Sequence, residues 1–309
     1  MRAIEAELGA RDWLGWERRE SPPAELERLA AVHPMEHVER VREMSQRGEA
    51  FDLDTPTSPG SWEAALHSAG GACALVEALM GGQALAGFAA GRPPGHHAER
   101  ARAMGFCLFN NVAVAARHAI DSLGAERVLV FDPDVHHGNG TNEIFHSSRD
   151  VLFASIHQWP FYPGTGELAD SGSGEGEGYS LNLPVPGGSG GETFLSLVEH
   201  VLAPVARQFA PDLLLVSAGF DAHRDDPVGG CRLSTDDFAE LARAVRALGE
   251  ELGAPVGAVL EGGYDLEALA ASVAATMEGL APEAGAAGSV PADGVTRAAA
   301  EQVGRYWKL

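Results

Sequence analysis

Residues 127–140 read RVLVFDPDVHHGNG, an apolar run followed at once by aspartate, histidine and glycine residues. The run Arg127–Phe131 is rich in branched and aromatic side chains, as is typical of a strand buried on both faces. The polar residues begin where that strand would end. In an open parallel sheet, ligands bind at the carboxyl ends of the strands. This stretch therefore predicts a parallel α/β fold and also the place of its functional site.

Other apolar runs alternate with helical patterns along the chain. The further candidate strands are Val151–Ile156, Leu213–Ser217, Pro255–Leu260 and, more weakly, Ala84–Ala90. Helical patterns lie near residues 24–47, 61–80, 107–122, 192–209, 235–252 and 265–280, with Ser234 placed to cap the fifth. This alternation favours one α/β domain over residues 1–309, with a mostly parallel sheet and helices on both faces. Residues 281–294 (APEAGAAGSVPADG) predict a flexible segment before a last helix.

The charge balance excludes some classes of function. The chain has 22 Lys+Arg against 44 Asp+Glu, a formal net charge of −22. Such a surface repels phosphates, so we expect no direct binding to nucleic acid and no attraction to anionic membranes. A cationic or amine-bearing substrate is compatible with it, although most of the carboxylates serve solubility.

The sequence carries no targeting or membrane signal. No apolar run approaches the roughly 18–20 residues of a membrane span, and the start MRAIEAELGARDW is charged. The three cysteines are far apart and odd in number, which excludes a disulfide framework and a thiolate zinc site. We expect a cytoplasmic enzyme, and the sequence is compatible with an oligomer.

Polar side chains follow four of the predicted strands. The segments at these strand ends are 132–140, 218–223, 261–264 and 91–97. Because the carboxyl ends of parallel strands meet at one edge of a sheet, we expect these segments to converge. This convergence of Asp, His and Tyr is the strongest functional signal in the sequence.

Asp134, His136 and Asp221 form a candidate metal site. Residues i and i+2 of an extended segment point to the same side, so Asp134 and His136 can bind one ion, and Asp221 offers a third ligand. Three protein ligands with an open position are typical of a catalytic site. Zinc fits this donor set, and Fe(II) or Mn(II) also suits it. The alternative is that these residues cap neighbouring helices, but three of them on two strands favour a metal.

His96 and His97 follow a Pro-Pro-Gly turn that would fix both imidazoles. A histidine can take a proton from an attacking water and give one to a leaving amine. Asp132 and Asn139 are candidate acceptors that would orient these rings. Tyr264 can hydrogen-bond a developing oxyanion, or it is simply a buried tyrosine beside a tight turn.

Several segments together resemble the histone deacetylase family, especially the class II-type bacterial amidohydrolases that include acetylpolyamine amidohydrolases. These segments read RPPGHHAERARAMGFCLFNNVAVAA, VLVFDPDVHHGNGT, SIHQWPFYPGTG, SAGFDAHRDDPVGG and EGGYDLEAL. The likeness runs from about Arg2 to the terminal RYWKL. It implies an arginase-like fold and a zinc-dependent deacylase.

The resemblance implies roles for individual residues. Zinc would bind to Asp134, His136 and Asp221. His97 would be the general base and then the acid, and His96 its electrostatic partner. Asp132 would orient His96, and Asn139 would orient His97. Tyr264 would hold the substrate carbonyl.

The resemblance also implies a narrow acyl-lysine tunnel and bound potassium. Phe106 and Tyr162 would form the tunnel walls, Gly105 its floor, and Asp54 would anchor the substrate backbone. The implied potassium ligands are Asp132, Asp134, His136, Ser155 and Ile156. A second monovalent site would involve Phe145, Ser148, Val151 and Tyr179.

This chain departs from the family pattern at three places, one of which, Asn142 in place of a frequent glutamine, we expect to matter little. Pro133 stands where the family usually has a bulky residue, and we expect the neighbouring ligands to keep their places. Family members usually have a strand and a loop reading like HPERP before the segment that begins at Arg2. We therefore expect that strand and one wall of the tunnel mouth to be absent. We also expect the acidic Asp225–Asp226 loop to lie near the mouth.

The function expected from these residues is hydrolysis of an acetylated lysine side chain or an acetylated small amine such as a polyamine. One alternative is a catalytically weak protein of the same fold that binds acyl-lysine. Another is a ureohydrolase such as arginase, but those enzymes use more aspartates to bridge two metals.

Overall fold

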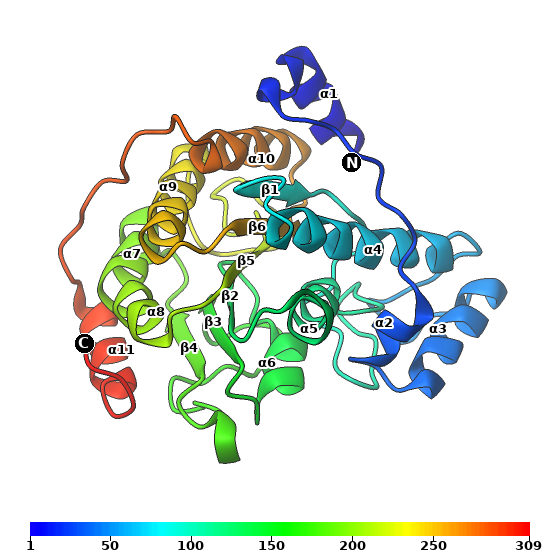
Figure 1. Ribbon diagram of the computed structural model, residues 1–309, viewed down its shortest axis with the longest axis horizontal. Coiled ribbons are helices and arrows are strands. Elements are labelled where there is room, and N and C mark those ends of the chain that lie inside the picture. The colour runs from blue at the N-terminus through cyan, green and yellow to red at the C-terminus, as the bar shows by residue number, and fades with distance from the viewer.

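Six parallel strands form the central sheet, in the order β1-β6-β5-β2-β3-β4 (Figure 1). The computed structural model describes residues 1–309. The strands are β1 (Ala86–Ala89), β2 (Val128–Asp132), β3 (Val151–Gln158), β4 (Ser180–Val185), β5 (Leu213–Ala218) and β6 (Val256–Leu260). Every neighbouring pair is parallel, which confirms the predicted sheet type. All strands predicted from apolar runs are present, and β4 is the one that the sequence reasoning missed.

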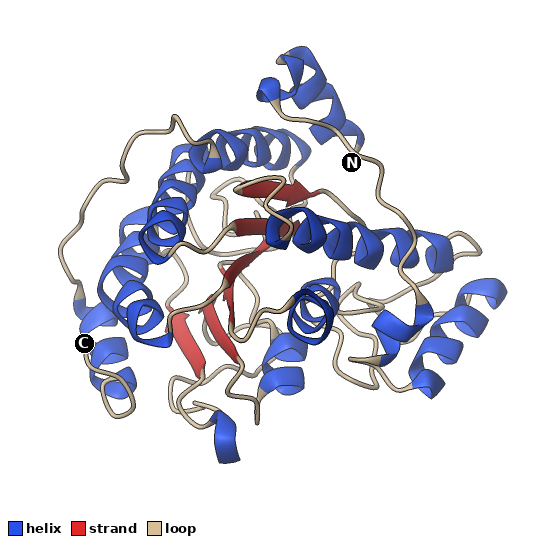
Figure 2. Cartoon of the chain, viewed as in Figure 1, coloured by secondary structure: helices blue, strands red, loops and turns tan.

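Helices surround the sheet (Figure 2). They are α1 (Arg2–Ala10), α2 (Leu26–Ala30), α3 (Met35–Arg47), α4 (Ser61–Met80), α5 (Asn111–Leu123), α6 (Asn139–Phe145), α7 (Gly191–Leu197), α8 (Ala203–Phe209), α9 (Thr235–Leu252), α10 (Leu266–Leu280) and α11 (Gly294–Val303). A π-helical turn, Val198–Leu202, joins α7 to α8, and short 3-10 turns cover Asp12–Gly15 and Gly174–Gly176. No helix has both the length and the apolar character needed to cross a membrane.

Helices cover both faces of the sheet. Successive residues of a buried strand point to opposite faces, so each strand contributes apolar side chains to both. In β2, Leu129 and Phe131 belong to a core shared with α7, α8, α9 and α10. Val128 and Val130 of the same strand belong to a second core, shared with α3, α4 and α5. The alternation within one apolar run therefore builds the two-faced α/β arrangement that the sequence predicts.

Capping residues set several helix boundaries. The helix predicted over 24–47 is two helices, because Pro34 lacks an amide hydrogen and serves as the N-cap of α3. The helix predicted from residue 107 starts at Asn111, since the Asn110 side chain caps it by accepting from the Ala113 amide. Ser234 caps α9 as predicted, in a reciprocal pair with Asp237.

The strand order places a topological switch point between β2 and β5. From β2 the chain moves outward through β3 and β4, then returns to the other side of β2 with β5 and continues to β6. In open α/β sheets, ligands usually bind in the crevice outside the carboxyl ends of the two strands where the order reverses. Asp134 and His136 follow β2, and Asp221 follows β5, so the fold brings the three candidate ligands to this crevice.

Residues 281–293 contain no helix or strand. Arg246 nevertheless donates to the Ala284 carbonyl, and Glu199 accepts from the Ser289 hydroxyl and the Val290 amide. The segment thus lies against α9 and the π-helical turn. Its flexibility stays a prediction.

Candidate functional site

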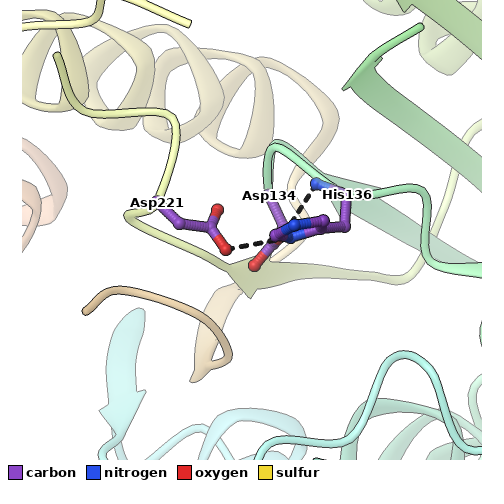
Figure 3. A group of neighbouring side chains, drawn as sticks. All are labelled: Asp134, His136 and Asp221. Carbon is purple, nitrogen blue, oxygen red and sulfur yellow. Dashed lines mark hydrogen bonds and ion pairs between the residues drawn. The ribbon is translucent and has the colours of Figure 1, made fainter. Parts of the chain in front are cut away.

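Asp134, His136 and Asp221 come together as the sequence predicts (Figure 3). One donor atom from each lies within 4.8 Å of the other two, and all three residues are buried. The His136 Nδ1 lies 3.1 Å from Asp134 Oδ1 and 3.1 Å from Asp221 Oδ2. Two carboxylates and one imidazole therefore face a common point.

Backbone groups hold the outer oxygens of both carboxylates. The Gly262 amide donates to Asp134 Oδ2 at 3.1 Å, and the Val135 amide donates to Asp221 Oδ1 at 2.9 Å. A Cβ at Gly219 would overlap the Asp134 carboxylate, and a Cβ at Gly262 would overlap that of Asp221. Glycine is therefore required at both places for the backbone to approach the ligands so closely.

The charges of this group favour a bound cation. Burial, together with the charge of Asp134, raises the pKa of Asp221 to about 7. Although burial opposes it, Asp221 and Asp134 raise the pKa of His136 to about 10. A divalent cation would relieve the repulsion between the two carboxylates. The set of two oxygens and one nitrogen fits zinc, Fe(II) or Mn(II).

The tandem histidines are buried, and their rings lie 4.0 Å apart between centroids. His96 Nδ1 lies 3.0 Å from Asp132 Oδ2, and His97 Nδ1 lies 2.8 Å from Asn139 Oδ1. These are the pairs that the resemblance implies. Both rings are held through Nδ1. The Nε2 atom of His97 forms no hydrogen bond to another protein group.

The surroundings of the two imidazoles shift their pKa values in opposite directions. Burial lowers the pKa of His97 well below its ordinary value, and the charge of His96 adds to the effect. Burial acts on His96 too, but the carboxylates of Asp132 and Asp134 outweigh it and raise the pKa of His96. His97 is therefore the neutral ring that can accept a proton, beside a cationic neighbour.

Glu261 is a site residue to which the sequence reasoning gave no role. Its carboxylate is fully buried and accepts from the Gly95 amide at 2.6 Å and from the His96 amide at 3.1 Å. The Ser217 hydroxyl donates to its other oxygen at 3.3 Å. Burial raises the pKa of Glu261 to about 7. An acidic residue directly after a wholly apolar strand was the signal that could have revealed it.

Tyr264 and Phe106 line the space next to the histidines, with ring centroids 5.8 Å apart. Burial, then the charges of Asp221 and Asp134, raise the pKa of Tyr264, so its phenol stays protonated and can donate a hydrogen bond. Gly105 packs against His97 so closely that a Cβ would overlap the imidazole.

Phe106 has a left-handed backbone, with φ of 68°, which is costly for a bulky residue. Its amide donates to the Thr55 hydroxyl at 3.3 Å, which helps to hold this conformation. The strain presents the Phe106 ring at the surface, where it is 41% exposed, beside Tyr264.

Tyr162 packs edge-on against His97, with ring centroids 5.1 Å apart and planes at 88°. Burial, followed by the charges of Asp52 and Asp54, raises the pKa of Tyr162 to about 12. Asp54 is exposed, and its charge is among those that act on the Tyr162 phenol. Phe161, to which we gave no role, stacks on His136 at 5.2 Å.

The Asp225–Asp226 loop was expected to bring two free charges near the tunnel mouth, where they could attract a cationic substrate, and for Asp226 this is wrong. Asp225 is exposed, but Asp226 is only 7% exposed and its carboxylate points inward. It accepts from the backbone amides of Tyr264, Asp265 and Val228. Asp226 is thus not a free charge at the surface, because a carboxylate hidden from water must satisfy its oxygens within the protein.

The residues implied in potassium binding lie around β3. Ser155 is paired in register with Asp132, and Ile156 follows it. In the second group, the carbonyls of Phe145 and Tyr179 already accept from the amides of Ser148 and Phe153, at 2.9 Å each. Cation binding at either place stays a prediction.

Comparisons with known proteins agree with this geometry. The histone deacetylase domain matches residues 2–280. A probable deacetylase of Methanothermobacter thermautotrophicus is 46% identical, over 86% of this chain and 81% of its own length. A histone deacetylase-like amidohydrolase of Pseudomonas aeruginosa is 41% identical, over 80% of this chain and 66% of its own length.

Two further proteins extend the comparison. Chloroplastic histone deacetylase 10 of Oryza sativa subsp. japonica is 41% identical over 82% of this chain, which spans only 60% of that longer protein. The crystal structure of the HDA15 HD domain superposes with a TM-score of 0.91 at 38% identity, covering 99% of this chain and 87% of that one. The chain belongs to the histone deacetylase family.

Proposed function

We propose that this protein is a metal-dependent amide hydrolase that removes acetyl groups from lysine side chains or from small amines such as polyamines. The observation that carries the proposal is the meeting of three kinds of group in one crevice. They are the metal-donor set of Asp134, His136 and Asp221, the neutral His97 held by Asn139, and the protonated phenol of Tyr264.

Zinc is the ion we propose, with Fe(II) as a second choice, held by Asp134, His136 and Asp221. A divalent cation at this place would polarise an amide carbonyl and lower the pKa of a water molecule. The backbone amides of Gly262 and Val135 would keep the two carboxylates oriented. We also propose structural potassium at the positions around β3.

His97 and Tyr264 would perform the remaining chemistry. His97 accepts a proton from water as the water oxygen attacks the amide carbon. Tyr264 donates a hydrogen bond to the carbonyl oxygen as negative charge develops there. His97 then returns the proton to the nitrogen as the carbon–nitrogen bond breaks, which yields acetate and a free amine. His96, bound to Asp132, supplies a positive charge beside His97 that keeps it from holding the proton too tightly.

The substrate would enter between Phe106 and Tyr162, which flank the histidines. A linear acyl-amine fits between two aromatic rings, since its methylenes pack on them while its amide reaches the polar centre. Asp54 and the neighbouring Asp52 would attract the cationic remainder of a peptide or polyamine, and Asp54 would anchor a substrate amide. Gly105 would form the floor.

The test is turnover by protein reconstituted with one equivalent of zinc, on acetyl-lysine peptides and acetylpolyamines. We expect release of acetate by the wild type and its loss in His97→Ala, with zinc retained. His67→Ala changes an exposed histidine away from the crevice and is the matched control. Stoichiometric zinc without turnover on any acylated amine would instead favour an acyl-lysine-binding protein.

A further inference from the structure

Asp226 is a buried carboxylate whose hydrogen bonds all go to backbone amides. Its Oδ2 accepts from the Tyr264 amide at 2.7 Å and the Asp265 amide at 3.2 Å, and its Oδ1 accepts from the Val228 amide at 2.9 Å. It forms no ion pair with an arginine, lysine or histidine. Both carboxylate oxygens of Asp226 therefore bind the backbone, and neither is available to bind a substrate.

The loop that carries Asp226 starts at the candidate metal ligand Asp221 and is itself tightly folded. The Asp226 amide donates to the His223 carbonyl at 3.0 Å, and the His223 amide donates to the Phe220 carbonyl at 3.2 Å. A Cβ at Gly229 would overlap the Asp221 carbonyl, so the end of the loop returns against its start. Asp226 is thus held in a fixed place relative to Asp221.

The Asp226 carboxylate is one of several restraints on the segment that it binds, since the Phe220 amide also donates to the Gly262 carbonyl at 2.9 Å. Tyr264 follows two glycines, and Gly263 has a φ of 134°, a conformation that other residues rarely adopt. The Gly262 amide is held by Asp134, and α10 begins only at Leu266. The Tyr264 amide itself is bound by Asp226 alone.

Stabilising α10 is not a sufficient role for Asp226. Asp265 already caps that helix, with its side chain accepting from the Ala268 amide at 2.8 Å. The shorter of the two bonds to this segment goes to Tyr264, the residue whose phenol must face the reacting amide.

We infer that Asp226 is a positioning residue for Tyr264, which ties the backbone of the oxyanion donor to the loop of the metal ligand Asp221. The inference rests on the proposed function for its kinetic consequence. Any movement of the Asp221 loop would carry Tyr264 with it, so the donor and the ligand keep their spacing. A hydrogen-bond donor must be placed to within a fraction of an ångström to stabilise a transition state.

The test compares Asp226→Ala with Asp236→Ala, the same substitution at an exposed position in the first turn of α9. Alanine has no acceptor oxygen, so the amides of Tyr264 and Asp265 lose their partner, whereas an asparagine could keep both of them on its one oxygen. With zinc-loaded protein and an acetyl-lysine peptide, we expect Asp226→Ala to lower kcat by about tenfold or more, with KM and zinc content unchanged. Asp236→Ala should match the wild type.

A double-mutant cycle separates positioning of the phenol from general damage. In a Tyr264→Phe background, Asp226→Ala should lower kcat by less than about twofold, because the group that Asp226 positions is already gone. An equal fold-loss in both backgrounds would overturn the inference, as would an unchanged kcat in the single variant.

Hydrogen exchange gives a readout that does not depend on activity. In metal-free protein, the amides of residues 262–268 should exchange faster in Asp226→Ala than in the wild type, while β2 and β5 remain protected. Unchanged exchange in this segment would overturn the inference. Faster exchange in a protein whose wild type hydrolyses no acylated amine would support the inference and count against the proposed function alone.

Discussion

Removal of the Glu261 side chain should loosen the loop that carries the tandem histidines. In Glu261→Ala, the amides of Gly95 and His96 lose their shared acceptor, and the Ser217 hydroxyl loses its own. The hydroxyl can rotate to another partner, but the two amides are fixed by the backbone. They would be left unpaired in a part of the protein that water does not reach.

The cost follows from those two amides. An unsatisfied buried donor costs about 1–3 kcal/mol, so two of them give about 2–6 kcal/mol. Release of a buried charge offsets part of this loss. We expect a net loss of about 3 kcal/mol in the free energy of unfolding, a large share of the roughly 5–15 kcal/mol typical of a domain.

Glu261→Gln is the matched control for shape. Its amide oxygen can accept from both backbone amides while its nitrogen donates to Ser217, so we expect a cost of about 1 kcal/mol or less. Glu261→Gln also replaces the ionisable carboxyl with an amide that does not titrate. The pKa of Glu261 is raised from 4.5 to about 7 in the folded protein, so the folded state takes up a proton more readily than the unfolded chain. Stability from this group is therefore present at low pH and is lost as the pH rises from about 4.5 to 7.

The assay is urea unfolding of metal-free protein at pH 5 and at pH 8, for wild type and both variants. The stability of the wild type relative to Glu261→Gln should fall by up to about 3 kcal/mol from the lower to the higher pH. Every other titrating group is present in both proteins, so its effect on the free energy of unfolding cancels when Glu261→Gln is subtracted from the wild type. The reasoning fails if Glu261→Ala stays within about 1 kcal/mol of the wild type, or if the difference from Glu261→Gln does not change with pH.

Three further predictions concern the crevice itself. Asp221→Ala should abolish stoichiometric zinc binding, measured by metal analysis after dialysis, and full zinc occupancy would contradict the ligand assignment. Tyr264→Phe should keep zinc and lower kcat by about 10²–10³-fold, and a near wild-type rate on acetyl-lysine would disprove the oxyanion role. Gly105→Ala should displace the His97 ring, because the added Cβ overlaps it and the φ of 56° disfavours alanine. Its kcat/KM should drop with zinc retained, and an unchanged value would show that the loop can move aside.

The fold could be predicted largely because its buried strands are continuous apolar runs. β2, β5 and β6 are buried at every residue, so their sequences contain almost nothing else. β4 escaped prediction because Asn182 and Pro184 interrupt its pattern. It lies at the edge of the sheet, where proline and polar residues are tolerated. The break between α2 and α3 was missed, although Pro34 marks it.

The convergence of the site could be predicted because parallel strands end at one edge. Its supporting contacts could not, because they depend on how distant loops meet. The bond from His96 to Glu261 spans 165 residues, and the bond from Tyr264 to Asp226 spans 38. The sequence pattern of an acidic residue in a loop predicts a surface charge, and this is why Asp226 was expected to be free to attract a substrate. The stacking of Phe161 on His136 could not be predicted either, because nothing in the sequence around Phe161 indicates that contact.

The strand order has a consequence for how the protein is made. β1 is synthesised first but pairs only with β6, the last strand, and β2 lacks its second neighbour until β5 emerges from the ribosome. A nascent chain that ends before residue 213 therefore exposes unpaired edges on both strands, which invite association with other chains. The same chain lacks Asp221 and cannot complete the metal-donor set. A metal ion could therefore bind only after β2 and β5 have paired. A chelator should then slow the final step of refolding more than the early steps.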